Sequence, residues 1–163
     1  ASGVERYLLS HYGAGQTAWL FAESSSSGKM AVYIYDDGTG NSGHWKYWHS
    51  SDSVFDNTWH LIGFSWNAGT MHLYLDGKSI PYTSGGTLAA NSIFNSTVNL
   101  SIGGTSTSGS FIGSMDEVRL YNEAIPTSQI KELYYSGLNN LFLKGGISKE
   151  EYLSMIKGYA SIN

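Results

Sequence analysis

The segment from His44 to His49 is the part of the sequence best suited to contact a ligand, and it reads His-Trp-Lys-Tyr-Trp-His. Successive side chains of an extended strand point to opposite faces, so Trp45 and Tyr47 share one face while Lys46 and Trp48 share the other. Exposed aromatic rings stack on sugar rings, and the flanking histidines can hydrogen-bond sugar hydroxyls. The segment predicts a sugar-binding site, although burial of both faces in a core fits the same pattern equally well. The candidate ligand-binding residues are His44, Trp45, Tyr47, Trp48 and His49.

The loop just before this segment gathers oxygen donors. Asp36, Asp37 and Asn41 lie within a few residues of one another, and carboxylate and amide oxygens are the ligands that Ca²⁺ takes in proteins. The loop lacks the closing Glu of an EF-hand. The sequence therefore names these three residues as a candidate calcium site, while favouring the simpler interpretation that they accept hydrogen bonds from backbone groups in a turn.

Carboxylates and histidines, the usual groups of hydrolytic sites, lack a catalytic arrangement here. Glycosidases place two carboxylates in one cleft, but Asp116 and Glu117 are adjacent and so face opposite sides of a regular strand. His60 and His72 fall within predicted strands, where a hydrogen bond beside the core is the simpler role. No Gly-x-Ser-x-Gly turn frames a serine nucleophile, and the chain has no cysteine. We therefore expect a protein that is not an enzyme.

The composition narrows the classes of partner. The 163 residues are 41% hydrophobic and 13% charged, with 20 glycines, which is the balance of a single β-rich domain with many turns. The net charge of -4 and the lack of a basic run do not fit a nucleic-acid-binding protein. No apolar run is long enough to span a bilayer. We expect neither a nucleic-acid partner nor a membrane span.

The run from Asn57 to Lys78 predicts two antiparallel strands that would help to position these residues. Thr58–Trp66 carries β-branched, aromatic and aliphatic side chains, and Thr70–Leu75 alternates apolar with polar residues. The residues between them, Asn67 to Gly69, supply the turn. Other strands are predicted at 4–11, 17–23, 29–35, 44–49, 97–102 and 115–121, with loops at 24–28, 36–43, 84–87 and 103–109. Short strands at this spacing are typical of a β-sandwich or a β-barrel.

The last forty or so residues have a helical pattern instead of a strand pattern. Pro126 stands where a helix would begin, apolar residues recur over Gln129–Tyr135, and Gly137 is placed to end the helix. A capping box at Ser148–Glu151 then predicts an amphipathic helix from about Lys149 to Tyr159. The apolar face of this second helix needs a partner, either the sandwich of the same chain or a neighbouring subunit.

Several motifs occur together in a familiar order: Trp59-His60, Trp66 to Gly69, Leu73 to Lys78, Ser101 to Gly104, and Phe111 to Asn122 followed by a helix. In this order they resemble the laminin-G-like, concanavalin A-like jelly-roll domains of secreted proteins. The resemblance covers roughly Val4 to Gly137. It implies an all-β fold, an antiparallel β-sandwich of the jelly-roll type with one or two short C-terminal α-helices, and ligands met by the concave sheet or the rim loops. We accordingly expect a domain over 1–137 and a helical extension over 138–163.

Members of this family generally begin with further strands before the position of Arg6 to Leu9. The resemblance therefore implies that N-terminal strands are missing here. Either the C-terminal tail replaces them, or another chain supplies them, or an upstream piece was cleaved off. An unpaired strand edge favours association. We expect a homo-oligomer or a parent assembly as one partner.

Three hypotheses for function follow from these observations. The first is a non-catalytic module that binds carbohydrate or a cell surface in adhesion, as part of an extracellular protein, with a glycan or a glycosylated surface as its partner. The second is a structural, decoration or assembly domain of a surface filament or of a virion such as a phage tail fibre. A glycoside hydrolase is a distant third.

Overall fold

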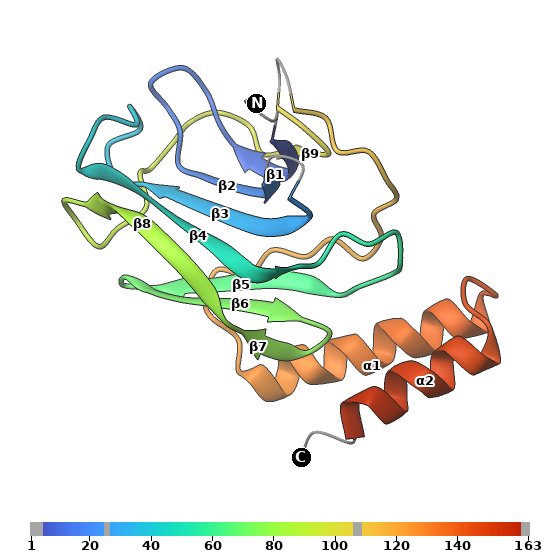
Figure 1. The fold of residues 1–163 in the computed structure, drawn as a ribbon. Coiled ribbons are helices and arrows are strands. Elements are labelled where there is room, and N and C mark those ends of the chain that lie inside the picture. The colour runs from blue at the N-terminus through green and yellow to red at the C-terminus, as the bar shows by residue number, and fades with distance from the viewer. Residues whose placement is uncertain (1–4, 25–26, 106–108, 161–163) are drawn as a thin grey trace.

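Two antiparallel sheets and a pair of helices make up the chain (Figure 1). The computed structural model describes residues 5–24, 27–105 and 109–160. Its strands are β1 (Arg6–His11), β2 (Trp19–Ser24), β3 (Lys29–Tyr35), β4 (His44–Ser53), β5 (Ile62–Asn67), β6 (Thr70–Leu75), β7 (Lys78–Ile80), β8 (Tyr82–Leu88) and β9 (Ser101–Ile102). The helices are α1 (Thr127–Leu143) and α2 (Lys149–Ala160). The large sheet has the order β8-β4-β3-β2-β1-β9 and the small one β5-β6-β7, which confirms the predicted all-β sandwich with C-terminal helices.

The core lies between the two sheets. On the inner face of the large sheet, Phe21, Val32 and Trp48 stand in one cross-strand row, and each is at most 5% exposed. Met71 and Leu73 of β6 belong to the same apolar cluster. Burial of such side chains contributes about 1.5–3 kcal/mol each to folding, so this row fixes which face of β4 is turned away from solvent.

The β5–β6 hairpin turns where the sequence predicted, but its first strand begins later in the chain than predicted. Its register ends at Asn67 opposite Thr70, and positive φ angles at Ala68 (45°) and Gly69 (91°) form the turn between the strands. The first strand begins at Ile62 instead of the predicted Thr58. Thr58 donates its backbone N–H and its hydroxyl to Asp56, so this stretch is a capped loop and not an extended strand.

The predicted strand at 115–121 is wrong, since no regular strand forms there. Among the described residues, no backbone hydrogen bond joins 112–125 to another segment, and Glu117 has a left-handed φ of 53°. A β-rich sequence becomes a strand only where a neighbouring strand pairs with it. Val118 and Leu120 are consequently 45% and 65% exposed. The strand predicted at 97–102 is likewise reduced to β9.

The loop predicted at 84–87 is also wrong, because these residues form the middle of β8 and pair with β4. A Cβ at Gly85 would collide with the Tyr47 hydroxyl, and one at Gly86 would collide with the Trp45 carbonyl. Glycine, which usually disfavours strands, is required here so that β8 can pass under the side chain of Tyr47.

The helix α1 starts after Pro126 as predicted but runs through Gly137 to Leu143. Its continuation buries Leu138 to 6% exposure against Tyr134 and Ile147. That burial outweighs the cost of about 1 kcal/mol for glycine inside a helix. The domain boundary expected at residue 137 falls inside this helix and stays a prediction.

The predicted capping box at the start of α2 is confirmed. Ser148 donates its N–H to Glu151 Oε2 at 2.7 Å, and Glu151 donates its N–H to Ser148 Oγ at 3.1 Å. The apolar face of α2 packs on α1, where the rings of Phe142 and Tyr152 stack at 4.8 Å. The two helices thus cover each other (Figure 1). No helix in the described part of the chain is long and apolar enough to cross a membrane.

Candidate functional site

The strands β3 and β4 are neighbours in the large sheet (Figure 1). Their pairing and alternation place a row of aromatic side chains on the face opposite the core. Tyr33 pairs with Tyr47 and Tyr35 with Trp45 across the two strands. Trp45 and Tyr47 are stacked at 5.8 Å between ring centroids, and Tyr47 and His49 lie at 4.8 Å. All five side chains are half-buried. We call this set the aromatic face: Tyr33, Tyr35, Trp45, Tyr47 and His49.

The structure brings together three of the five residues predicted to bind a ligand, namely Trp45, Tyr47 and His49. Trp48 is only 2% exposed and lies in the core on the inner face, so it is not part of this surface. His44 is the first residue of β4, where alternation places it on the same face as Lys46 and Trp48, and its Nδ1 lies 2.8 Å from Asp36 Oδ1. The alternation along β4 separates Trp48 from its neighbours, as the sequence indicated.

Two members of the aromatic face, Tyr33 and Tyr35, are absent from the sequence-based set. Their signal is the same spacing of two that joins Trp45 and Tyr47 on β4. It becomes informative only when the register places Tyr33 opposite Tyr47. Cross-strand pairing, and not the pattern within one strand, defines this surface.

A pocket of about 500 Å³ opens at one end of the aromatic face. Tyr12, Tyr33, Tyr35 and Trp45 line it together with the carboxylate of Glu5 and a wall of small residues from the 13–17 and 38–40 loops. Tyr33 donates its hydroxyl to Glu5 Oε1 and lies 3.1 Å from His49 Nε2. Because the Tyr33 proton is given to the carboxylate, His49 is the donor of that second bond.

The tyrosines around Glu5 are held in their neutral form. Burial, followed by the charge of Glu5, raises the pKa of Tyr35 to about 12. Burial and Glu5 likewise raise the pKa of Tyr7 to about 12 and that of Tyr33 further. Burial, followed by the charge of Lys29, lowers the pKa of His49. The pocket therefore presents neutral phenol groups around one carboxylate.

The two carboxylates of the predicted calcium loop already accept hydrogen bonds. Asp36 accepts hydrogen bonds from the Ala90 N–H at 2.6 Å and from His44, while Asp37 accepts the N–H and the hydroxyl of Thr39. Asp36, Asp37 and His44 do place one ligand atom each within 4.8 Å of one another. A nitrogen ligand does not suit Ca²⁺, which takes oxygen. The donor set fits the turn interpretation better than calcium, which stays a prediction.

His60 belongs to a hydrogen-bonded chain that resembles a catalytic relay in composition only. Its Nδ1 lies 2.8 Å from Asp76 Oδ2, and its Nε2 lies 2.9 Å from Thr58 Oγ1. The Thr58 hydroxyl donates to Asp56 at 2.7 Å, so it accepts from His60. The hydrogen bond to Asp76 raises the pKa of His60. Both ring nitrogens thus act as donors, and His60 is no base for this hydroxyl.

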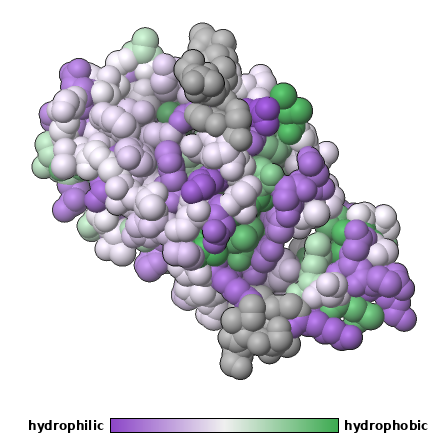
Figure 2. All heavy atoms as spheres, in the orientation of Figure 1, coloured by the Kyte–Doolittle hydropathy of each residue, from purple (hydrophilic) through white to green (hydrophobic). Residues whose placement is uncertain are grey.

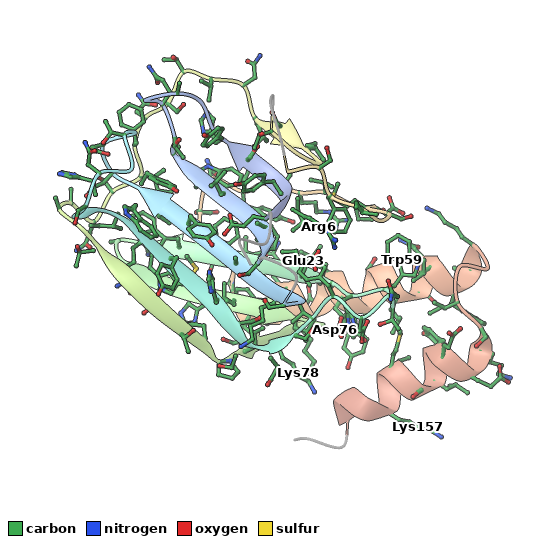
Figure 3. The ribbon with its side chains drawn as sticks, turned by 45° about the horizontal axis from the view of Figure 1, so that its top comes forward. Arg6, Glu23, Trp59, Asp76, Lys78 and Lys157 are labelled. Carbon is green, nitrogen blue, oxygen red and sulfur yellow. The ribbon has the colours of Figure 1, made fainter. Side chains whose placement is uncertain are left out.

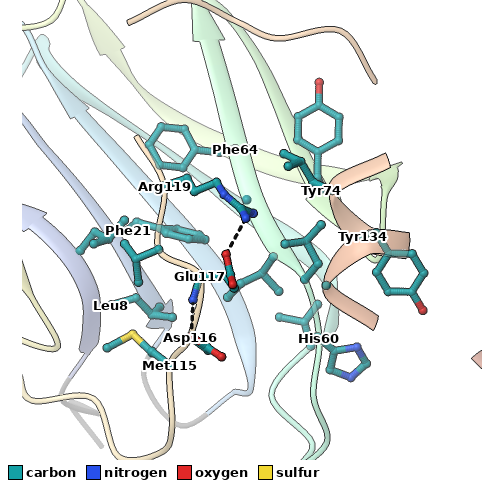
Figure 4. A pocket seen from close by; sticks show the side chains of 18 of the residues that line it. Leu8, Phe21, His60, Phe64, Tyr74, Met115, Asp116, Glu117, Arg119 and Tyr134 are labelled. Atoms are coloured by element: carbon teal, nitrogen blue, oxygen red, sulfur yellow. Dashed lines mark hydrogen bonds and ion pairs between the residues drawn. The ribbon is translucent and has the colours of Figure 1, made fainter. Parts of the chain in front are cut away.

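A second and larger opening, a groove of about 900 Å³, lies between the sandwich and α1. Figure 4 shows Phe21 from the large sheet and Phe64 from β5 along it, with Glu117 and Arg119 paired beside them. Arg6 and Glu23 also line it and are joined at 3.1 Å (Figure 3). Figure 2 shows apolar side chains beside the hollow between the sandwich body and the helices.

The groove follows an unpaired strand edge. Among the described strands, β5 pairs only with β6, and residues 112–125 line the same groove. Trp66 lines the groove, and its Nε1 is buried with no hydrogen-bond partner in the described part of the molecule. A free edge beside apolar side chains is a surface on which another strand can pair.

The two sheets, their hairpins and the helix that follows define a jelly-roll β-sandwich of the lectin-like class. The chain belongs to the concanavalin A-like lectin/glucanases superfamily, whose family model matches residues 2–131. The resemblance to laminin-G-like and concanavalin A-like domains is thereby confirmed.

A comparison with solved structures finds a likeness to the crystal structure of an S-layer domain-containing protein, residues 221–444, from Clostridium thermocellum ATCC 27405. The two are 15% identical with a TM-score of 0.39, and the match covers 82% of this chain and 64% of that one. This chain thus spans less than two thirds of that structure. No curated protein matches the sequence.

Proposed function

We propose that this domain is a non-catalytic carbohydrate-binding module of an extracellular protein, which binds glycans on a surface through the aromatic face. The observation that carries the proposal is the continuous row of half-buried rings on β3 and β4. Such rings offer apolar surface for sugar stacking, and the hydroxyls and carboxylate of the adjoining pocket offer hydrogen bonds. Membership of a superfamily named for lectins is consistent with this role.

A glycan array tests the proposal with three proteins: the wild type, Trp45→Ala and Tyr82→Ala. Tyr82 is a matched control because it is a 39% exposed aromatic residue of β8 that pairs with Ser50, on the opposite face from Trp45. We expect the wild type to bind at least one glycan class and Trp45→Ala to bind about tenfold more weakly. Tyr82→Ala is expected to bind as the wild type does. Absence of binding by the wild type to every glycan would overturn the proposal.

The groove favours a second candidate function, that of an assembly domain. It combines the free edge of β5 with the exposed apolar side chains of Ile112, Val118 and Leu120. We propose that a second copy of the chain covers this surface. Glycan binding and assembly use different faces, so each is tested separately.

A further inference from the structure

The pocket beside the aromatic face is lined by aromatic rings and a single negative charge. Its lining combines the rings of Tyr12, Tyr33, Tyr35 and Trp45 with one carboxylate, that of Glu5. No lysine or arginine is among the described residues that line it. A carboxylate accepts hydrogen bonds from the hydroxyls of a neutral sugar, but its charge in addition attracts a cationic ligand and repels an anionic one.

The carboxylate is fixed in place by the rings around it. Tyr33 donates its hydroxyl to Glu5 Oε1. A neutral phenol thus orients the charge without cancelling it. Arg6, the first residue of β1, is paired instead with Glu23, so it does not compensate the Glu5 charge.

Aromatic rings grouped around a carboxylate form a site for an organic cation. The faces of Tyr and Trp rings carry negative electrostatic potential and attract ammonium groups within about 6 Å of the ring centre. Here Tyr33 and Tyr35 lie 6.4 and 6.5 Å from Trp45 between centroids, so one ammonium group can contact several rings. The volume of about 500 Å³ is within the ordinary range for small-ligand pockets, about 300–1,000 Å³.

We propose that this pocket binds a sugar carrying a protonated amino group, with Glu5 as the counter-ion and the surrounding rings as the cage. The inference rests on the proposed carbohydrate-binding function and specifies its ligand class. A neutral part of the glycan lies along Trp45 and Tyr47, and the ammonium group enters the pocket next to Glu5.

Three oligosaccharides of equal length and linkage test the inference, because they differ only at carbon 2: β1,4-linked glucosamine, its N-acetylated form and the corresponding glucose oligomer. Calorimetry at a pH that keeps the amines protonated compares them on the wild type. We expect the amine form to bind about tenfold more tightly than either neutral form. Glu5→Gln, which preserves an acceptor for Tyr33, is expected to abolish that preference without changing the melting temperature.

The control for general attraction between an acidic protein and a polycation is Glu123→Gln, which removes one charge from an exposed position outside the pocket. We expect this variant to retain the preference. Equal binding of the three oligomers, or equal loss in both variants, overturns the inference. If choline competes at the pocket but the amine oligomer does not, the cage takes a quaternary ammonium and the sugar assignment is wrong. Array binding of neutral glycans without amine preference would leave the proposed function standing, whereas binding of no glycan at all would remove both.

Discussion

At the scale of single residues, Trp45 and Trp48 show how three positions along one strand separate two roles. Trp48 is 2% exposed within the core, whereas Trp45 is half-buried on the outer face. We expect Trp48→Ala to lower the free energy of unfolding by about 3–5 kcal/mol, as large-to-small changes of aromatic core residues do. Trp45→Ala is expected to cost much less. Urea unfolding of both variants gives the comparison, and equal losses would contradict the assignment of faces.

The carboxylates of the 36–41 loop give a second residue-scale prediction. Asp36 and Asp37 already accept hydrogen bonds from Ala90, His44 and Thr39, so a cation would have to displace them. We expect thermal melts in millimolar Ca²⁺ and in chelator to share one midpoint, because a ligand raises stability only when it binds the folded state. A midpoint several degrees higher with Ca²⁺, abolished in Asp37→Asn, would instead support the calcium site.

At the scale of elements, α1 contains a glycine that the helix does not require. A Cβ at Gly137 would meet no atom within 4 Å, and the helix continues past it to Leu143. Gly137→Ala is therefore expected to raise the free energy of unfolding by about 1 kcal/mol. Gly85→Ala provides the contrast, because its new Cβ would collide with the Tyr47 hydroxyl. Chemical denaturation should show opposite signs for the two variants, and a loss in Gly137→Ala would contradict the packing described here.

The loop before β5 and the turn after β6 are joined by a pH-sensitive pair. The hydrogen bond to Asp76 raises the pKa of His60 above its ordinary value of 6.5. Folding thus favours the protonated ring, so this stabilisation is full below about pH 6.5 and is lost as the pH rises through the raised pKa. Asp76→Asn should flatten that part of the stability profile while His72→Gln leaves it unchanged. Urea midpoints measured from pH 5 to 9 provide the test, and an unaltered slope in Asp76→Asn would refute the pairing.

The same elements show what sequence patterns predict and where they stop. The turn at Ala68 and Gly69 and the capping box at Ser148 are local signals, and both are found as predicted. The alternation in β6 holds from Thr70 to Leu73 but ends at Tyr74, which is 4% exposed. Strand formation at 115–121 depends on a neighbour that the pattern does not supply. The glycines of β8 are explained only by the side chain of Tyr47 on the adjacent strand.

In the candidate site, too, local patterns identify some residues, and contacts between strands identify the others. Trp45 and Tyr47 can be chosen from one strand, but Tyr33 enters the aromatic face through cross-strand register. Glu5 enters the pocket through a contact between positions 28 residues apart. Long-range pairing of this kind has no counterpart in local periodicity.

At the scale of the whole molecule, the apolar side chains of the two helices are covered, whereas those along the groove beside β5 are not. The helices α1 and α2 bury their apolar faces against each other and against Leu61. The groove along β5 instead leaves an unpaired edge beside exposed apolar side chains. Soluble proteins usually protect such edges, so the groove is where association is expected.

A pair of matched substitutions tests association through this groove. Leu120 is 65% exposed and lines the groove, whereas Leu143 is 71% exposed at the end of α1 and does not line it. We expect the wild type to show a concentration-dependent increase in mass by analytical ultracentrifugation. Leu120→Lys should remain a monomer, because a charge in the groove must be desolvated when a second copy covers it. Leu143→Lys should associate like the wild type. A wild type that stays monomeric up to high micromolar concentration, or a Leu143→Lys variant that dissociates as fully as Leu120→Lys, would show that a second copy of the chain does not occupy the groove.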